Sequence, residues 1–321
     1  MNYSGNTTSA SLTLSSTSST MVSSNDGRYI HFALCMIVIN AVMAFVSVFL
    51  NLLIILTFVS TSSLQQTPSN ALVLGLAIVD FAVGIFSQPV FCIRLFSELN
   101  SDDRLYQITD LLYSVGFTLQ LFVSLGTLTA ITADRFLAVN IHLRYQQVVT
   151  TQRYGVALTF IWIISFLLSF TRYMVTDMEN ESSKNVALLL YIIVIVGIVL
   201  MNFYFVFKIS RVIRRHSLQI HAQQQSVQPS IDMPRYKKSV NTMYFIIGGF
   251  VWSYVFLVGV LVVYAVIQKR SQEINCLFLV TETIMMFNGV LNPLIYCARV
   301  QEIRKAAALL SRKVVFCQTI E

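Results

Sequence analysis

The sequence predicts an all-α membrane protein, in which seven spanning helices form a bundle and a short amphipathic eighth helix follows. Composition is the first reason: 55% of the 321 residues are hydrophobic and only 12% are charged, against about 25% charged residues in soluble domains. The second reason is that the apolar residues gather into seven segments, each reaching the roughly 20 residues that a helix needs to cross a bilayer. The alternation over about 10 residues that marks barrel strands is not present.

The segments follow one another in a simple order. Residues 1–28 form a Ser/Thr-rich tail that we expect to be extracellular and disordered, residues 29–297 form the seven-helix domain, and residues 298–321 form an amphipathic helix and a short cytoplasmic tail. Within the domain, the apolar segments predict spans at 29–58, 70–96, 105–139, 154–174, 185–209, 236–267 and 274–297. Helices are expected because a backbone exposed to lipid must satisfy its own hydrogen bonds.

Two observations place the N-terminus outside the cell. Asn2, Asn6 and Asn180 each begin an Asn-x-Ser/Thr acceptor for N-glycosylation, and with seven spans all three lie on the same side of the membrane. On that topology most of the 22 basic residues lie on the inner side, as the positive-inside rule expects. The sequence therefore predicts a multi-pass protein with an extracellular N-terminus.

Polar side chains within the spans are candidates for function, because burying them in hydrocarbon is costly. Asp80 in the second span is the most informative, since an isolated carboxylate there must be protonated or have a cationic partner. Ser124, Asn288 and Asn292 could complete an oxygen cage for a small cation around it. The alternative is that such groups form hydrogen bonds that hold neighbouring helices together, which is the interpretation we favour for Asn51.

Two motifs lie at inner ends of spans. Asp134-Arg135-Phe136 ends the third span, and the seventh ends Asn292-Pro293-Leu294-Ile295-Tyr296, where the proline removes a helical hydrogen bond and makes a deformable point. These motifs resemble those of the class A, rhodopsin-like G-protein-coupled receptors. Further residues agree with that family at the expected places in their spans: Asn51, Leu76, Ala77, Asp80, Pro89 and Trp162. The chain looks most like the melanocortin and adenosine receptor branches and related invertebrate orphan receptors.

The resemblance implies a plasma-membrane receptor that binds an extracellular ligand and activates a heterotrimeric G protein, with arrestin as a further partner. Arg135 would contact the G protein and would be held at rest by Asp134. Tyr204 and Tyr296 would move in to stabilise the active form, with Pro293 beside them in the seventh span. Asp80, Ser124, Asn288 and Asn292 would form a sodium pocket that favours the resting form.

Other classes of function fit less well. A transporter or channel could use Asp80 as part of a polar pathway, but it has no need of the two inner-face motifs together. A ligand-independent member of the same fold stays open because the sixth span is altered. The sequence contains none of the nucleophile, phosphate-loop or metal-ligand motifs of enzymes, so we expect neither an enzyme nor a nucleic-acid binder, and no cofactor besides sodium.

The chain departs from the family at three places. Asp110 stands where the family has the cysteine that bonds the third span to the second outer loop, and residues 176–184 contain no cysteine. Val196 replaces the proline of the fifth span. In the sixth span, Tyr254 takes the position of the switch aromatic if Phe250 is aligned with the family's phenylalanine, whereas Trp252 is the alternative in a register shifted by two.

Glu282 is the candidate ligand-binding residue of the seventh span. It lies ten residues before Asn292, about 15 Å further out along the helix, so it could provide a counter-charge for a cationic ligand. Phe117, Phe91 and Tyr254 could frame such a group. The alternative is that a neighbouring helix or water satisfies the carboxylate.

The cysteines give two further expectations. Cys317 follows the amphipathic segment and is a candidate for palmitoylation, with a free thiol as the alternative. Cys92 and Cys276 lie near the outer ends of neighbouring spans in an oxidising compartment. A disulfide between them could replace the missing disulfide of the third span, and free buried thiols are the alternative.

Overall fold

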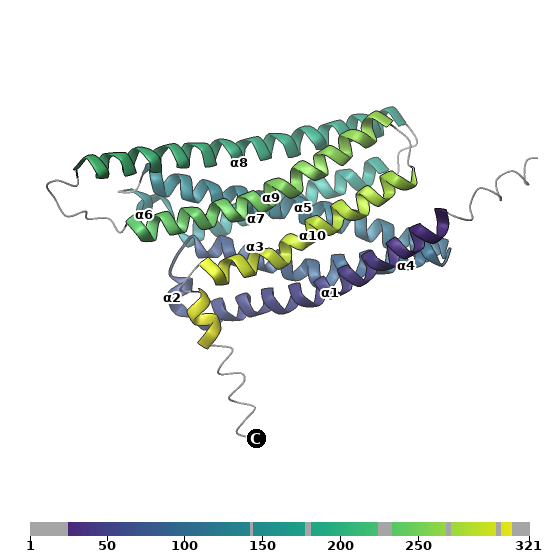
Figure 1. Cartoon of the computed structure of the whole chain (residues 1–321), viewed down its shortest axis with the longest axis horizontal. Coiled ribbons are helices and arrows are strands. Elements are labelled where there is room, and N and C mark those ends of the chain that lie inside the picture. The colour runs from purple at the N-terminus through teal and green to yellow at the C-terminus, as the bar shows by residue number, and fades with distance from the viewer. Residues whose placement is uncertain are drawn as a thin grey trace, which may run out of the picture.

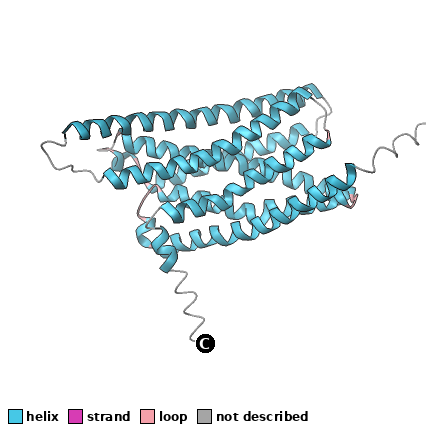
Figure 2. Cartoon of the chain, viewed as in Figure 1, coloured by secondary structure: helices cyan, strands magenta, loops and turns pink. Residues whose placement is uncertain are grey.

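The computed structural model describes residues 25–141, 144–176, 181–223, 233–267, 271–299 and 303–309. These residues are almost entirely helical and include no strand (Figure 2). Seven of their helices are long and apolar enough to cross a membrane. Asn2, Asn6, Asn180 and Cys317, the predicted modification sites, lie outside the described residues.

The long helices run side by side along the bundle (Figure 1). The first span is α1 (Asn25–Ser60), and the second is built from α3 (Asn70–Ala82), η1 (Val83–Ser87) and α4 (Gln88–Leu99). The remaining spans lie in the following helices: α5 (Asp103–Asn140), α7 (Thr151–Thr176), α8 (Glu181–Gln223), α9 (Met233–Ile267) and α10 (Gln272–Arg299). Two single turns, α2 (Ser62–Gln65) and α6 (Tyr145–Val148), lie between spans. Each predicted span is therefore confirmed, although the second is divided.

The third span, α5, occupies the centre of the bundle, where it packs against α3, α4, α7, α8 and α9. Its buried residues are mostly apolar or small hydroxyl side chains, such as Leu125, Leu128 and Thr127. The outward faces of the bundle are also apolar: Phe45 is 76% exposed and Trp252 is 69% exposed. Side chains of this kind are compatible with lipid but not with water, so the bundle is a membrane domain.

The two ends of the described chain lie at opposite ends of the bundle (Figure 1), as an odd number of spans requires. Residues 303–309 form a further helix after α10. Ile303 and Ala307 on this helix are buried, whereas Arg304 and Lys305 are exposed. The predicted amphipathic eighth helix is confirmed over these residues.

The second span contains one π-helical turn, η1, which brings Gly84 against α1. A Cβ atom on Gly84 would lie 2.7 Å from the Val48 Cγ2 atom and 3.1 Å from the Ala44 carbonyl oxygen. Single π turns within helices are frequent at functional sites. This turn lies between Asp80 and Arg94 in the second span. It therefore sets the direction in which the Arg94 side chain points around the helix axis relative to Asp80.

Replacing Gly84 with alanine is expected to destabilise the protein. The new methyl group would force α1 and η1 apart at a cost of about 1–3 kcal/mol, which exceeds the roughly 1 kcal/mol that alanine gains over glycine in a helix. Gly259→Ala is the matched control, because no atom of another described helix lies within 4 Å of the added Cβ position there. Thermal unfolding in detergent measures both variants. Equal melting temperatures for the two would contradict the prediction.

Candidate functional site

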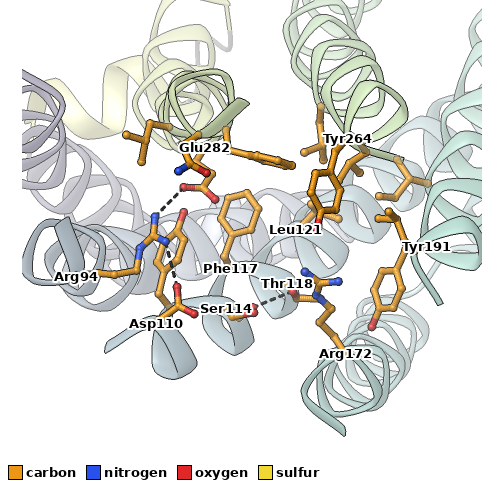
Figure 3. A pocket seen from close by; sticks show the side chains of 18 of the residues that line it. Arg94, Asp110, Ser114, Phe117, Thr118, Leu121, Arg172, Tyr191, Tyr264 and Glu282 are labelled. Carbon is orange, nitrogen blue, oxygen red and sulfur yellow. Dashed lines mark hydrogen bonds and ion pairs between the residues drawn. The ribbon is translucent and has the colours of Figure 1, made fainter. Parts of the chain in front are cut away.

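A cavity of about 510 Å³ lies at the end of the bundle where α1 and α5 begin, which is the outer end on the predicted topology. All seven spans contribute to its lining, and Figure 3 shows these side chains pointing inward. Aromatic and aliphatic residues form most of the walls. The charged residues that line it are Arg94, Glu98, Asp110, Arg172 and Glu282.

Arg94 of α4 is the centre of the charged wall. Its side chain is 7% exposed, and its two terminal nitrogens lie 3.1 Å from Asp110 Oδ1 in α5 and 3.3 Å from Glu282 Oε2 in α10. Its guanidinium also lies over the rings of Tyr113 and Phe91, at 4.7 and 5.6 Å from their centroids, which adds a cation–π attraction. One buried arginine therefore joins three spans at the outer end (Figure 3).

The structure places Glu282 in the cavity wall, where the sequence placed it, but not as an unpaired counter-charge. Arg94 already contacts one of its carboxylate oxygens. This agrees with the alternative interpretation, in which a side chain from a neighbouring helix satisfies the carboxylate. Sequence reasoning missed Arg94. An arginine inside an apolar segment must find a partner, and that signal could have led to the ion pair.

The four residues expected to bind ligand separate into two pairs. Glu282 and Phe117 line the outer cavity. Phe91 differs from expectation, because it is fully buried behind Arg94 and is not among the lining residues. Tyr254 lies deeper, 1% exposed, and donates a hydrogen bond to the Leu121 carbonyl at 2.9 Å.

The structure also separates the two candidates for the switch aromatic. Tyr254 faces the bundle and packs on Phe250, with ring centroids 6.3 Å apart. Trp252 instead points away from the bundle and is exposed. The register that aligns Phe250 with the family is therefore the one that places an aromatic side chain in the core.

Asp80 lies at the centre of a polar cluster at mid-membrane depth. The residue is 4% exposed, and its carboxylate accepts a hydrogen bond from Asn292 Nδ2 at 2.8 Å. Asp80, Ser124 and Asn288 line a second, small cavity of about 10 Å³, roughly the size of one water molecule or ion. The structure thus brings together the residues predicted to hold a small cation.

Gln120 of α5 also lines this small cavity, and sequence reasoning missed it. Its side-chain oxygen is buried and accepts no hydrogen bond from the described residues. A buried oxygen beside a buried carboxylate fits a cation, because hard cations prefer oxygen ligands. An amide that faces a cavity has no hydropathy signal, so only its position on α5 reveals it.

Asn51 has the structural role that the sequence favoured. Its amide nitrogen donates to the Gly289 carbonyl at 2.8 Å, and to Ser47 within its own helix. Ser47 in turn donates to the Asp80 carbonyl at 3.2 Å. These bonds fix α1 against α3 and α10 at the depth of the Asp80 cluster.

At the inner end of α5, the Asp134 carboxylate is held from three directions. It is 1% exposed, and it accepts hydrogen bonds from the phenols of Tyr145 in α6, at 2.5 Å, and Tyr154 in α7. Arg135 lies beside it, with Nε 3.5 Å from Asp134 Oδ2. Burial and the bond to Asp134 raise the pKa of the Tyr145 phenol to about 12, so this hydroxyl stays protonated and donates at physiological pH.

Replacing Tyr154 with phenylalanine is expected to destabilise the inner end of the bundle. A hydrogen bond to a charged group contributes about 1.5–3 kcal/mol, and Tyr145 cannot replace the lost donor because it already uses its own hydroxyl. Tyr173→Phe on the same helix is the control, since Tyr173 packs on Phe170 and makes no hydrogen bond to the described residues. In thermal unfolding in detergent, Tyr154→Phe should have a clearly lower melting temperature than Tyr173→Phe. The same melting temperature for both would show that the second phenol contributes nothing.

The other residues expected to act in activation lie apart in this structure. Tyr296 is 2% exposed, and its hydroxyl has no hydrogen-bond partner among the described residues. Tyr204 of α8 is 52% exposed, with the Lys208 ammonium 5.5 Å from its ring centroid. Pro293 lies buried inside α10 between Asp80's partner Asn292 and Tyr296.

The structure does not form the predicted Cys92–Cys276 disulfide. Both residues are free thiols, as are Cys35 and Cys297. The Cys92 sulfur instead points toward α1, where it lies 3.5 Å from the Ile37 carbonyl oxygen. Helix rotation therefore turns Cys92 away from α10.

Comparisons with known proteins agree with this architecture. Residues 50–296 match the family described as 7 transmembrane receptor (rhodopsin family). Adenosine receptor A2b of Canis lupus familiaris is 31% identical over 127 residues, which are 39% of this chain and 36% of that receptor. Adenosine receptor A3 of the same species is 33% identical over 142 residues, 43% of each chain. Protein trapped in endoderm-1 of Drosophila melanogaster is 30% identical over 142 residues, 44% of this chain and 35% of that protein.

Each of these relatives is matched over less than half of its own length. The family match is broader, because it covers most of the chain and nearly all of the seven-helix bundle. It begins just before Asn51 and ends at Tyr296, and so includes both inner-face motifs and the Asp80 cluster. The chain therefore belongs to the rhodopsin family of seven-transmembrane receptors.

Proposed function

We propose that this chain is a plasma-membrane receptor that binds a small extracellular ligand in the outer cavity and activates a heterotrimeric G protein at its inner face. One observation carries the proposal: a single central helix, α5, lines the cavity from Tyr106 to Phe122 and ends in the Asp134–Arg135 pair. A ligand that moves α5 relative to its neighbours acts on both ends of the membrane. Arrestin would bind the same inner face.

Signalling in such a receptor is a shift between two populations. A ligand changes the equilibrium only by its difference in affinity for the resting and active arrangements. Asp134 holds Arg135 at rest through the contact at 3.5 Å, and the two phenols keep Asp134 in place. Activation would free Arg135 for the G protein and draw the exposed Tyr204 side chain inward toward Tyr296.

The names of two relatives point to adenosine as a first ligand to test. The cavity carries two arginines and three carboxylates in its lining, however. Adenosine is neutral and has no charged group that could pair with these side chains. The lining therefore favours a ligand with a cationic group that approaches Asp110 and Glu282.

Reconstitution tests the proposal without a known ligand. The purified receptor in nanodiscs is mixed in turn with heterotrimers of each Gα class, and guanine-nucleotide exchange is measured against empty nanodiscs. Faster exchange with at least one class is expected from the basal population of active receptor. No acceleration with any class would contradict the proposal, and solute uptake by proteoliposomes would then favour a transporter.

Sodium is expected to stabilise the resting receptor through Asp80. The residues that would hold the ion are Asp80, Ser124, Asn288 and Gln120, which line the small cavity, with Asn292 bonded to Asp80. A ligand present at about tenfold its Kd adds about 1.4 kcal/mol of stability. Replacing choline by sodium should therefore raise the melting temperature of the wild type, and Asp80→Asn should abolish the rise.

The same linkage predicts that sodium lowers the affinity of any agonist, because the two favour opposite states. Glu273→Gln is the control for loss of an acidic residue, since Glu273 lies exposed at the outer end of α10. It should keep the full sodium effect. A wild-type protein that melts at the same temperature in sodium and in choline would remove sodium from the proposal.

A further inference from the structure

The outer cavity is divided by charge. On one side, Glu98, Asp110 and Glu282 gather around Arg94. On the other side, Arg172 of α7 extends into the cavity beside Thr118 (Figure 3). Phe117 and Leu121 lie between the two sides (Figure 3). A molecule that fills this cavity therefore meets carboxylates at one end and a guanidinium at the other.

The carboxylate side carries an excess of negative charge. Two acids, Asp110 and Glu282, share the buried Arg94 guanidinium. The third acid, Glu98, accepts a hydrogen bond from the neutral Tyr29 hydroxyl at 2.8 Å. The Asp110 side chain is 44% exposed and lines the cavity. Charges in a largely buried site interact more strongly than in water, and this excess attracts a cation.

A buried phenol lies on the same side as the carboxylates. Tyr113 lines the cavity, is 3% exposed and interacts with the Glu282 carboxylate. The carboxylate side of the cavity therefore holds a neutral hydroxyl group beside its acids.

The middle of the cavity is apolar and aromatic. Tyr264 of α9 and Phe278 of α10 pack edge to face with centroids 5.8 Å apart, and Phe117 stacks on Tyr113 at 5.6 Å. Rings prefer tilted or offset contacts with other rings. The volume of about 510 Å³ falls within the range of about 300–1,000 Å³ for small-molecule sites.

We propose that the ligand is a small zwitterion with an aromatic body, of the class of aromatic amino acids and short peptides with free termini. Its ammonium lies against Asp110 and Glu282, its carboxylate lies against Arg172, and its ring packs between Phe117 and Tyr264. The inference rests on the proposed function, because it takes the outer cavity to be the ligand site. It adds to the proposed cationic ligand an anionic group, which Arg172 recognises, and so excludes simple amines as the ligand.

Binding is tested directly, by the thermal stability of the purified receptor. The probes are dipeptides and tripeptides that contain Phe or Tyr, each compared with its N-acetylated form, which lacks the cation, and its C-terminal amide, which lacks the anion. Peptides with both termini free are expected to raise the melting temperature. Either blocked form should bind at least about tenfold more weakly. Equal stabilisation by a blocked form, stabilisation by adenosine alone, or no stabilisation by any peptide would overturn the proposal.

Matched variants assign the two ends. Arg172→Gln should remove the preference for the free carboxylate over the amide, and Asp110→Asn should reduce the preference for the free amine. Arg104→Gln and Glu273→Gln are the controls, since both residues are exposed at the outer end and neither lines the cavity. They should leave both preferences intact. Unchanged preferences in Arg172→Gln would overturn the assignment. The melting assay requires no G protein, so its outcome is independent of the nucleotide-exchange test.

Discussion

Replacing Arg135 with alanine is expected to abolish G-protein activation while leaving the receptor folded and at the cell surface. The arginine side chain is about one-third exposed, and its ion pair is with Asp134 on the same helix, so its loss does not break an ion pair between helices. Losing a charged group from a buried contact with a partner protein costs about 2–5 kcal/mol, which is roughly 30-fold or more in affinity. Guanine-nucleotide exchange in nanodiscs measures the effect.

The control for this variant is Arg304→Ala, which removes an exposed arginine from the terminal helix over residues 303–309. It should exchange nucleotide as fast as the wild type. Cell-surface expression of both variants is measured in parallel, so that loss of protein is not mistaken for loss of coupling. Wild-type exchange rates in Arg135→Ala would show that the G protein does not use this residue.

Replacing Arg94 with leucine is expected to cause the largest loss of stability of any single substitution at the outer end. It removes the ion pair with Glu282, whose side chain is 15% exposed, and the contacts to Asp110 and to the Tyr113 ring. Breaking a buried ion pair in this way costs about 3–5 kcal/mol, and most of it comes from Glu282 because Asp110 is partly exposed. We expect the melting temperature in detergent to fall by about 6–10 °C.

A second substitution separates the ion pair from the packing. Arg94→Leu combined with Glu282→Leu removes both charges, and replacing a buried pair by apolar residues is often neutral. The double variant should therefore recover much of the stability, and the difference from the sum of the single effects gives the coupling. Arg104→Leu, at an exposed site, is the control. A loss in Arg94→Leu no greater than in the control would show that the ion pairs are not holding the three spans.

Hydropathy alone was enough to predict the seven spans, because crossing a bilayer requires about 20 apolar residues whatever the helix packs against. The contact between Asp80 and Asn292 could also be predicted, since both belong to motifs whose places in the family fold are known. The π turn at Val83–Ser87 could not, because a backbone that adds one residue per turn has no pattern of side-chain types.

The errors have a common physical origin in helix rotation. The sequence gives the depth of a residue along a span, but not the direction in which its side chain points. Cys92 lies at the predicted depth and yet faces Ile37 rather than Cys276. Phe91, one residue earlier, faces the interior behind Arg94 rather than the cavity. A π turn earlier in the same span changes its rotation, so these residues were the most difficult to place.

The ionic junction around Arg94 also bears on how this protein can be made. Its outer end is joined by charge rather than by sulfur, and the described cysteines are all free thiols. A reducing agent therefore has no covalent bond to cut among them, and an oxidising folding compartment is not needed to form the junction. Cell-free synthesis into nanodiscs, in the reducing mixtures that translation requires, is compatible with this fold. High salt is the condition to avoid at the exposed Asp110 side of the junction, since screening weakens exposed charges first.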